Sequence, residues 1–396
     1  MCHYPGIRPA DPTTEAGSFS NPSLVVIGVL VALRVVVAGV TVDSQSGLLK
    51  VDVARFRQIA SSEGRPYRDH VVEYAPAETL AIEFLAEGDL RSTAVRLAAL
   101  ALACDLLAFA GLWFGWGRRP AVLYLLIGLP LVPFIYARLD PVVVMLAVWG
   151  MAFARRGRER VGGAALALAA LTKLWPLVMA PALLIEGRRR ALGWFAVLSG
   201  VGFAAWLAYG GVDGIRQVVS FRGATGWEIE STVGAVVWLF TDGPVRVEGG
   251  APRVGEIPGW SRALLLLVLM AALVAIWARA RGRRVDPAGA PSLAAIAALI
   301  ALTPLFSLQY VLWLVPWAAI AWTDARTVRM GRIAFAISLL TGVLAFFYVG
   351  SFRPTHPQVL SVGSLVNVLL LVRDGLCLWV AAIWLRRDPS LRPATA

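Results

Sequence analysis

The chain has 396 residues, of which 58% are hydrophobic and 16% charged, and its mean hydropathy is +0.70. Soluble domains contain about 45–50% apolar and about 25% charged residues, so this composition excludes an ordinary water-soluble globule. The net charge of +12 comes from arginines clustered between apolar segments, which is a signature of membrane topology and not of nucleic-acid binding.

Twelve apolar segments follow one another along the chain, and each is a candidate membrane span. They lie at 23–41, 93–116, 121–136, 141–154, 161–172, 176–186, 191–210, 260–278, 289–303, 308–322, 333–350 and 360–385. If all of them cross, the arginine clusters share one side, as the positive-inside rule requires. We therefore expect an all-α polytopic membrane protein with about 12 transmembrane helices and both termini in the cytoplasm.

This topology divides the chain into one transmembrane domain and two short tails. The tails are 1–22 and 387–396, and the domain is 23–386, with outer loops at 42–92 and 211–259. In the first outer loop, apolar positions 53, 56 and 59 have helical spacing, which predicts an amphipathic helix in the interface. The stretch 77–90 is apolar but contains three glutamates, so it is expected to form a second interfacial helix and not a span.

Three successive pairs of segments have arms too short to cross a bilayer fully: 121–136 with 141–154, 161–172 with 176–186, and 289–303 with 308–322. An arm of 12 residues rises about 18 Å, against a hydrocarbon core of about 30 Å. The apices are polar and contain Arg138, Asp140, Lys173, Ser307, Gln309 and Tyr310. Polar backbone at that depth requires protein cover or a wet cavity, so we expect a cavity open to the outside. The alternative is that Arg138 and Lys173 extend to the interface.

Four further charges lie inside apolar segments: Arg34, Asp105, Arg373 and Asp374. Each costs at least about 2.5–3.5 kcal/mol at the bilayer centre and so requires a partner or a function. A structural pair of Arg34 with Asp105 or Asp374 is the simplest expectation. Neighbouring helical residues point to different faces, so Arg373 and Asp374 are not expected to neutralise each other.

Several short motifs stand at the outer ends of the spans, in a characteristic order. They are Asp52, Gly64-x-Pro66-Tyr67-x-Asp69, Glu73-Tyr74-x-Pro76, Lys173-Leu174-Trp175-Pro176, Arg222 with 227–231, and Ser307-Leu308-Gln309-Tyr310 with Trp313. Across roughly residues 25–385, this series resembles glycosyltransferase family 87, the polyprenol-phosphate-mannose-dependent α-mannosyltransferases. The resemblance implies a GT-C-like helical bundle, an inverting transfer of mannose, and a role for Asp52 as the catalytic base.

The chemistry of such a transfer can also be argued from the residues. A phosphate leaves as an anion and needs no general acid, so one base and several cations suffice. Asp52 lies just outside the first span, where it can deprotonate a sugar hydroxyl. The candidates for holding the donor phosphate are Lys173, Arg222, Arg353 and His356. The candidates for holding acceptor or sugar are Arg68, Asp69, Glu73, Tyr74, Glu230, Gln309 and Tyr310.

No cofactor is expected, because the sequence contains no Asp-x-Asp pair and no cluster with metal-ligand spacing. The expected partners are a polyprenol-phosphate sugar, a glycolipid or glycan acceptor, and the lipids of a bacterial plasma membrane. A secondary transporter or lipid flippase is the main alternative, since broken hairpins and intramembrane charges also suit alternating access. A scaffold without chemistry is a third interpretation, and an arabinose donor remains an alternative to mannose.

Overall fold

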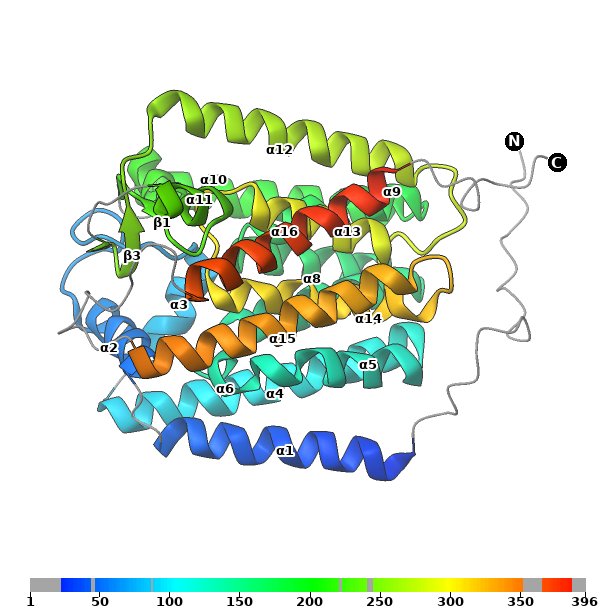
Figure 1. Cartoon of the computed structure of the whole chain (residues 1–396), viewed down its shortest axis with the longest axis horizontal. Coiled ribbons are helices and arrows are strands. Elements are labelled where there is room, and N and C mark those ends of the chain that lie inside the picture. The colour runs from blue at the N-terminus through cyan, green and yellow to red at the C-terminus, as the bar shows by residue number, and fades with distance from the viewer. Residues whose placement is uncertain are drawn as a thin grey trace.

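The computed structural model describes residues 23–43, 47–86, 88–220, 223–240, 245–351 and 365–386. Within them the chain is a bundle of helices with one small sheet, so the predicted all-α polytopic fold is confirmed (Figure 1). The helices are α1 (Leu24–Asp43), α2 (Gly47–Ser61), α3 (Pro76–Leu85), α4 (Leu90–Trp116), α5 (Arg118–Gly128), η1 (Leu129–Leu131), α6 (Val132–Ile135), α7 (Asp140–Arg155), α8 (Glu159–Thr172), η2 (Trp175–Met179), α9 (Ala180–Ile185), α10 (Arg189–Val219), α11 (Thr232–Phe240), α12 (Gly259–Ala280), α13 (Ala290–Ala301), η3 (Leu308–Trp313), α14 (Val315–Thr323), α15 (Val328–Ser351) and α16 (Leu365–Leu385).

Every apolar segment expected from the sequence contains helix. The helices differ in length, and those in the three pairs with short arms include some too short to cross a bilayer. Seven of the described helical stretches are long and apolar enough to cross a membrane: α1, α4, α5 to α6, α10, α12, α15 and α16. By contrast, α7, α8 and α13 have only 16, 14 and 12 residues. The short arms are therefore present as helices, and the total number of crossings stays a prediction.

The short helices form the centre of the bundle, while α1 and α12 run along its two outer edges (Figure 1). Helix α13 shows why this arrangement is possible. Its sequence is rich in alanine, and all but one of its twelve residues are buried. Small side chains let neighbouring backbones approach closely, which favours helix packing where water supplies no driving force.

The first outer loop folds into the two expected helices, α2 and α3, and Val53, Phe56 and Ile59 are buried on one face of α2. Their position relative to a membrane stays a prediction. The turn between them contains Tyr67 at φ 72°, a conformation that a bulky residue rarely adopts. Gln217 of α10 holds this turn, because it donates to the Tyr67 carbonyl and accepts from the Val72 amide. The loop is thus a packed part of the molecule.

The second outer loop begins later than the sequence suggests. We expected the preceding helix to end near residue 210, but α10 continues to Val219 across a break at Gly211, where φ is 68°. Glycine adopts this value without a steric penalty, so the helix can change direction and continue. The remainder of the loop forms α11 and a small antiparallel sheet in the order β1 (Trp227–Glu228), β3 (Ala251–Val254), β2 (Arg246–Glu248).

The buried charges inside the bundle give one confirmed and one wrong expectation. Arg34 pairs with Asp105 at 2.9 Å, as predicted. The expectation that Arg373 and Asp374 do not neutralise each other is wrong, because the Nε of Arg373 lies 2.8 Å from Oδ1 of Asp374. The two Cβ atoms do point to different faces, but the long arginine side chain folds back to its neighbour. Both side chains are fully buried, so the pairing offsets part of their desolvation cost.

Candidate active site

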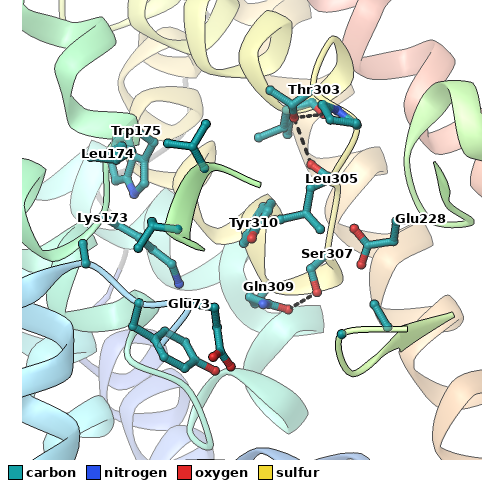
Figure 2. Close-up of a pocket in the computed structure, with 18 of the residues that line it drawn as sticks. Glu73, Lys173, Leu174, Trp175, Glu228, Thr303, Leu305, Ser307, Gln309 and Tyr310 are labelled. Atoms are coloured by element: carbon teal, nitrogen blue, oxygen red, sulfur yellow. Dashed lines mark hydrogen bonds between the residues drawn. The ribbon is translucent and has the colours of Figure 1, made fainter. Parts of the chain in front are cut away.

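A cavity of about 1010 Å³ lies among the helical ends near α2, α3 and the small sheet. Its walls come from the first outer loop, all three hairpin apices, the sheet and α12. Figure 2 shows Lys173 on one wall, reaching toward Gln309 and Tyr310, with Glu228 on the opposite wall. The structure therefore contains the predicted cavity, and the apex residues Arg138, Asp140, Lys173, Ser307, Gln309 and Tyr310 all line it. The membrane side on which it opens stays a prediction.

Asp52 reaches the cavity from the second turn of α2. Its Oδ2 lies 2.5 Å from Nη2 of Arg138, and 15% of its side chain is exposed. Burial raises the pKa of Asp52 to about 6, although Arg138 and Lys173 act in the opposite direction. The carboxylate thus borders the cavity and has a pKa closer to neutral pH than that of an ordinary aspartate.

Lys173 lies between two acidic side chains. Its Nζ is 2.9 Å from Oδ2 of Asp140 and 3.6 Å from Oε1 of Glu78. Burial alone lowers the pKa of Lys173, but the two carboxylates raise it above its ordinary value, so the ammonium form persists. Burial in turn raises the pKa of Glu78 to about 7, with Lys173 opposing it.

The three hairpin apices meet at Asp140, the first residue of α7. Its second oxygen, Oδ1, accepts a hydrogen bond of 2.7 Å from Nε1 of Trp313. The Trp313 ring stacks on Tyr310 at 4.0 Å and on Trp175 at 5.5 Å between centroids. Lys173 lies over the faces of Tyr310 and Trp313, at 5.7 and 5.9 Å. One buried carboxylate therefore links all three apices, and aromatic rings form part of the wall.

The opposite wall is built around two glutamates on β1 and the turn after it. Oε2 of Glu228 accepts the Phe306 amide at 3.1 Å, and Oε2 of Glu230 accepts the Leu308 amide at 3.0 Å. Burial raises the pKa of Glu228 to about 7 and that of Glu230 to about 8. Of the two, only Glu228 lines the cavity. The pair fixes the third apex against the sheet.

Near Asp52, Arg55 and Glu73 form a two-pronged ion pair. Arg55 Nε donates to Oε1 of Glu73 at 3.0 Å, and Nη2 donates to Oε2 at 2.7 Å. Next to them, Tyr74 packs edge-on against Phe56 at 5.5 Å. Arg55, Glu73 and Tyr74 line the cavity. This wall therefore offers a hydroxyl-bearing ligand both charged groups and an aromatic surface.

The structure brings together half of the residues predicted for the site. Those that line the cavity are Asp52, Glu73, Tyr74, Lys173, Gln309 and Tyr310. Three others lie elsewhere: Arg68 donates to the Ala208 carbonyl on α10, Asp69 accepts the Arg65 amide within its own turn, and Glu230 holds the Leu308 amide. Arg222, Arg353 and His356 fall outside the described residues.

Several cavity-lining charges were not among the residues chosen from the sequence. They are Arg55, Glu78, Glu228, Arg253 and Arg262, whereas Arg138 and Asp140 are among the apex residues expected at the cavity. Glu78 could have been chosen from the sequence, because a glutamate within an apolar stretch requires polar surroundings. Glu228 shares a short motif with Glu230, and sequence alone does not indicate which of the two faces inward.

Comparison with known proteins gives a match to one family. Residues 89–307 match the family model of glycosyltransferase family 87, which covers more than half of the chain. The matched range includes Asp140, Lys173 and Glu228, whereas Asp52 and Glu73 precede it. A search of curated proteins gave no match.

Proposed function

Since the chain belongs to glycosyltransferase family 87, we propose that this membrane glycosyltransferase takes its sugar from a polyprenol-phosphate donor, with mannose as the sugar. The acceptor is a lipid-linked or cell-envelope glycan on the outer face of a bacterial plasma membrane. Both termini are cytoplasmic in this proposal, and the cavity is the reaction chamber.

The observation that carries the proposal is the state of Asp52. An effective general base has a pKa near the working pH and reaches the reacting proton. Asp52 lines the cavity, and burial raises its pKa to about 6. Arg138 contacts one carboxylate oxygen and orients the group.

The cavity walls suit a lipid phosphate. Lys173 supplies a buried cation, and Arg253 and Arg262 add positive charge from the sheet and from α12. Charged donors bind phosphate oxygens with short, strong hydrogen bonds. On the α12 side, Leu265, Leu266 and Leu269 line the same cavity with apolar surface, which supports a carrier with a hydrocarbon chain over a nucleotide. Arg222, Arg353 and His356 remain candidates for the same phosphate.

The reaction proceeds by displacement at the anomeric carbon. The acceptor hydroxyl oxygen forms a bond to that carbon while its proton passes to the Asp52 carboxylate. The carbon–oxygen bond to the phosphate breaks, its electron pair stays on the phosphate oxygen, and the cations stabilise the anion that leaves. An in-line attack on a β-linked donor gives an α-linked product with inversion. In this proposal, the sugars are held around this centre by Glu73, Tyr74, Gln309 and Tyr310, which line the cavity.

The decisive experiment measures the transfer of radiolabelled mannose from polyprenol-phosphate-mannose to endogenous lipid acceptors in membranes. The wild type is compared with Asp52→Asn, which keeps side-chain size and removes the base. Loss of general-base catalysis lowers rates by about 10²–10⁴-fold, so the variant should transfer almost nothing. The matched control is Asp213→Asn, the same chemical change at a side chain that is 78% exposed on α10.

The outcomes separate the parts of the proposal. Equal transfer by Asp52→Asn and wild type, at equal protein level, refutes Asp52 as the base and shifts the role to another cavity carboxylate. Absence of mannose transfer in both, with transfer from polyprenol-phosphate-arabinose, changes the donor sugar. Absence of transfer from either donor refutes the polyprenol-phosphate class.

A further inference from the structure

Asp140 is a charged residue of the cavity wall that takes no part in the reaction proposed above, although its side chain links all three hairpin apices. Its side chain is 1% exposed, and both of its oxygens are engaged. One oxygen contacts the Lys173 ammonium at 2.9 Å, and the other accepts the Trp313 indole N–H at 2.7 Å. A carboxylate so held cannot turn toward a substrate.

The position of Asp140 in the fold explains how its orientation is fixed. It is the first residue of α7 and is followed by Pro141, whose restricted φ suits the first turn of a helix. A negative charge at a helix N-terminus is also stabilised by the backbone dipoles. The carboxylate is therefore anchored by the helix on one side and by Lys173 and Trp313 on the other.

Lys173, in contrast, belongs to a short connection between α8 and η2 and has a flexible side chain. A lysine ammonium is a compact charge that loses its proton readily when buried. The charged or titratable groups around it are Asp52 from α2, Glu78 from α3, Arg138 and Asp140 from the first apex, and Tyr310 from the third. Of the two carboxylates that pair with it, Asp140 is the closer.

We propose that Asp140 is a positioning residue that keeps Lys173 charged and fixed above the Tyr310–Trp313 surface, where the ammonium receives the donor phosphate. The inference rests on the proposed function, since it specifies how that site holds its anionic donor. Asp140 itself touches neither substrate. Its contribution reaches the donor through Lys173.

The proposal makes a specific prediction for the pH dependence of donor affinity. In the wild type, with Asp140 present, Lys173 stays protonated. The KM for the donor should therefore not change as the pH rises above neutrality. In Asp140→Asn, Lys173 keeps the influence of Glu78 and Asp52 but loses its closer ion-pair partner, so burial lowers its pKa. Donor KM should then rise about tenfold for each pH unit above the new pKa, because each unit removes about nine-tenths of the charged form.

The second variant distinguishes positioning from a merely structural role. A guanidinium keeps its charge at all accessible pH values. In the double variant Asp140→Asn/Lys173→Arg, the alkaline rise in donor KM should therefore disappear, even if the geometry lowers kcat. A structural defect at Asp140 would instead lower kcat in both variants without any change in the pH profile. A flat profile for Asp140→Asn would overturn the proposal, as would an alkaline rise that survives in the double variant.

A binding measurement keeps this inference separable from the proposed function. Binding of polyprenyl phosphate to purified protein in detergent is followed through quenching of tryptophan fluorescence, since Trp175 and Trp313 line the cavity. If the wild type neither transfers mannose nor binds polyprenyl phosphate, the proposed function fails. If the wild type binds and Asp140→Asn binds with the same pH dependence, only the role of Asp140 fails.

Should Asp140→Asn not fold, Glu78→Gln provides the test in its place. It removes the more distant partner of Lys173, at 3.6 Å, and leaves Asp140 intact. The expected result is a flat alkaline profile for polyprenyl phosphate binding. An alkaline loss of binding in Glu78→Gln would assign the role to Glu78 and overturn the proposal.

Discussion

Two groups of charges in this molecule are both built around ion-paired aspartates but differ in what surrounds them. In the first, Asp105 accepts hydrogen bonds from Arg34 at 2.9 Å, Tyr124 at 2.5 Å and Tyr136 at 2.8 Å, and none of these four residues lines the cavity. In the second, Asp52 pairs with Arg138 and Asp140 pairs with Lys173, but these four residues line the cavity. Burial and ion pairing are common to both groups, and access to the cavity distinguishes them, so only the second group is open to the proposed chemistry.

The largest expected effect concerns the first group, around Asp105, which does not line the cavity. Asp105→Asn removes the charge that balances Arg34 and should lower the free energy of unfolding by about 3–5 kcal/mol, as is typical when one partner of a buried pair is lost. Thermal unfolding in detergent, with Asp213→Asn as the matched control, measures it. The transfer rate per folded molecule should stay unchanged, and a selective loss of transfer at unchanged stability would contradict the comparison.

The next largest effect is expected when Asp105 stays in place and loses only one of its hydrogen-bond donors. Tyr124→Phe deletes one hydroxyl that donates to Asp105 and leaves the ion pair in place. A hydrogen bond to a charged group contributes about 1.5–3 kcal/mol, so the loss of stability should lie in this range. Tyr209→Phe, at a side chain 48% exposed on α10, is the control and should change stability by less than about 0.5 kcal/mol. Equal destabilisation by the two variants would show that the hydroxyl network adds nothing.

The smallest expected effect concerns Asp52, in the group that lines the cavity. It is measured as the pH dependence of the transfer rate. The base works in its deprotonated form, and the pKa of Asp52 is raised to about 6. The transfer rate at limiting substrate should therefore be constant above pH 6 and fall about tenfold, or about 1.4 kcal/mol, for each unit below it. Initial rates between pH 5 and pH 8 test this, with unfolding monitored in parallel. If the transfer rate does not fall between pH 6 and pH 5, Asp52 is not the base.

Much of the fold could be predicted because the membrane constrains it locally. Apolar length located the helices, and the short arms around Arg138, Lys173 and Ser307 located the cavity. Helical spacing located the buried face of α2. The Gly211 break was not predicted, because a glycine in a helix gives no signal of whether its backbone departs from helical values.

The site was predicted less well, since its partners are distant in the sequence. Asp140 contacts Lys173 and Trp313, which are 33 and 173 residues away, and no local pattern indicates such pairs. Arg68 and Asp69 belong to a motif-bearing loop, yet their side chains stabilise that loop. Proximity in a motif therefore identified the correct loop without identifying which of its side chains face the cavity.

The two hydrogen bonds from Gln217 also have a consequence for biosynthesis. They join α10 to the loop after α2, across 145 and 150 residues of chain. A membrane protein emerges from the ribosome with its N-terminal part first, and contacts of such long range form only when the later segment arrives. The turn that follows the Asp52-bearing helix α2 therefore gains these two contacts only after more than half of the chain has been made. A chain still shorter than this in the membrane would lack both contacts between the turn and α10.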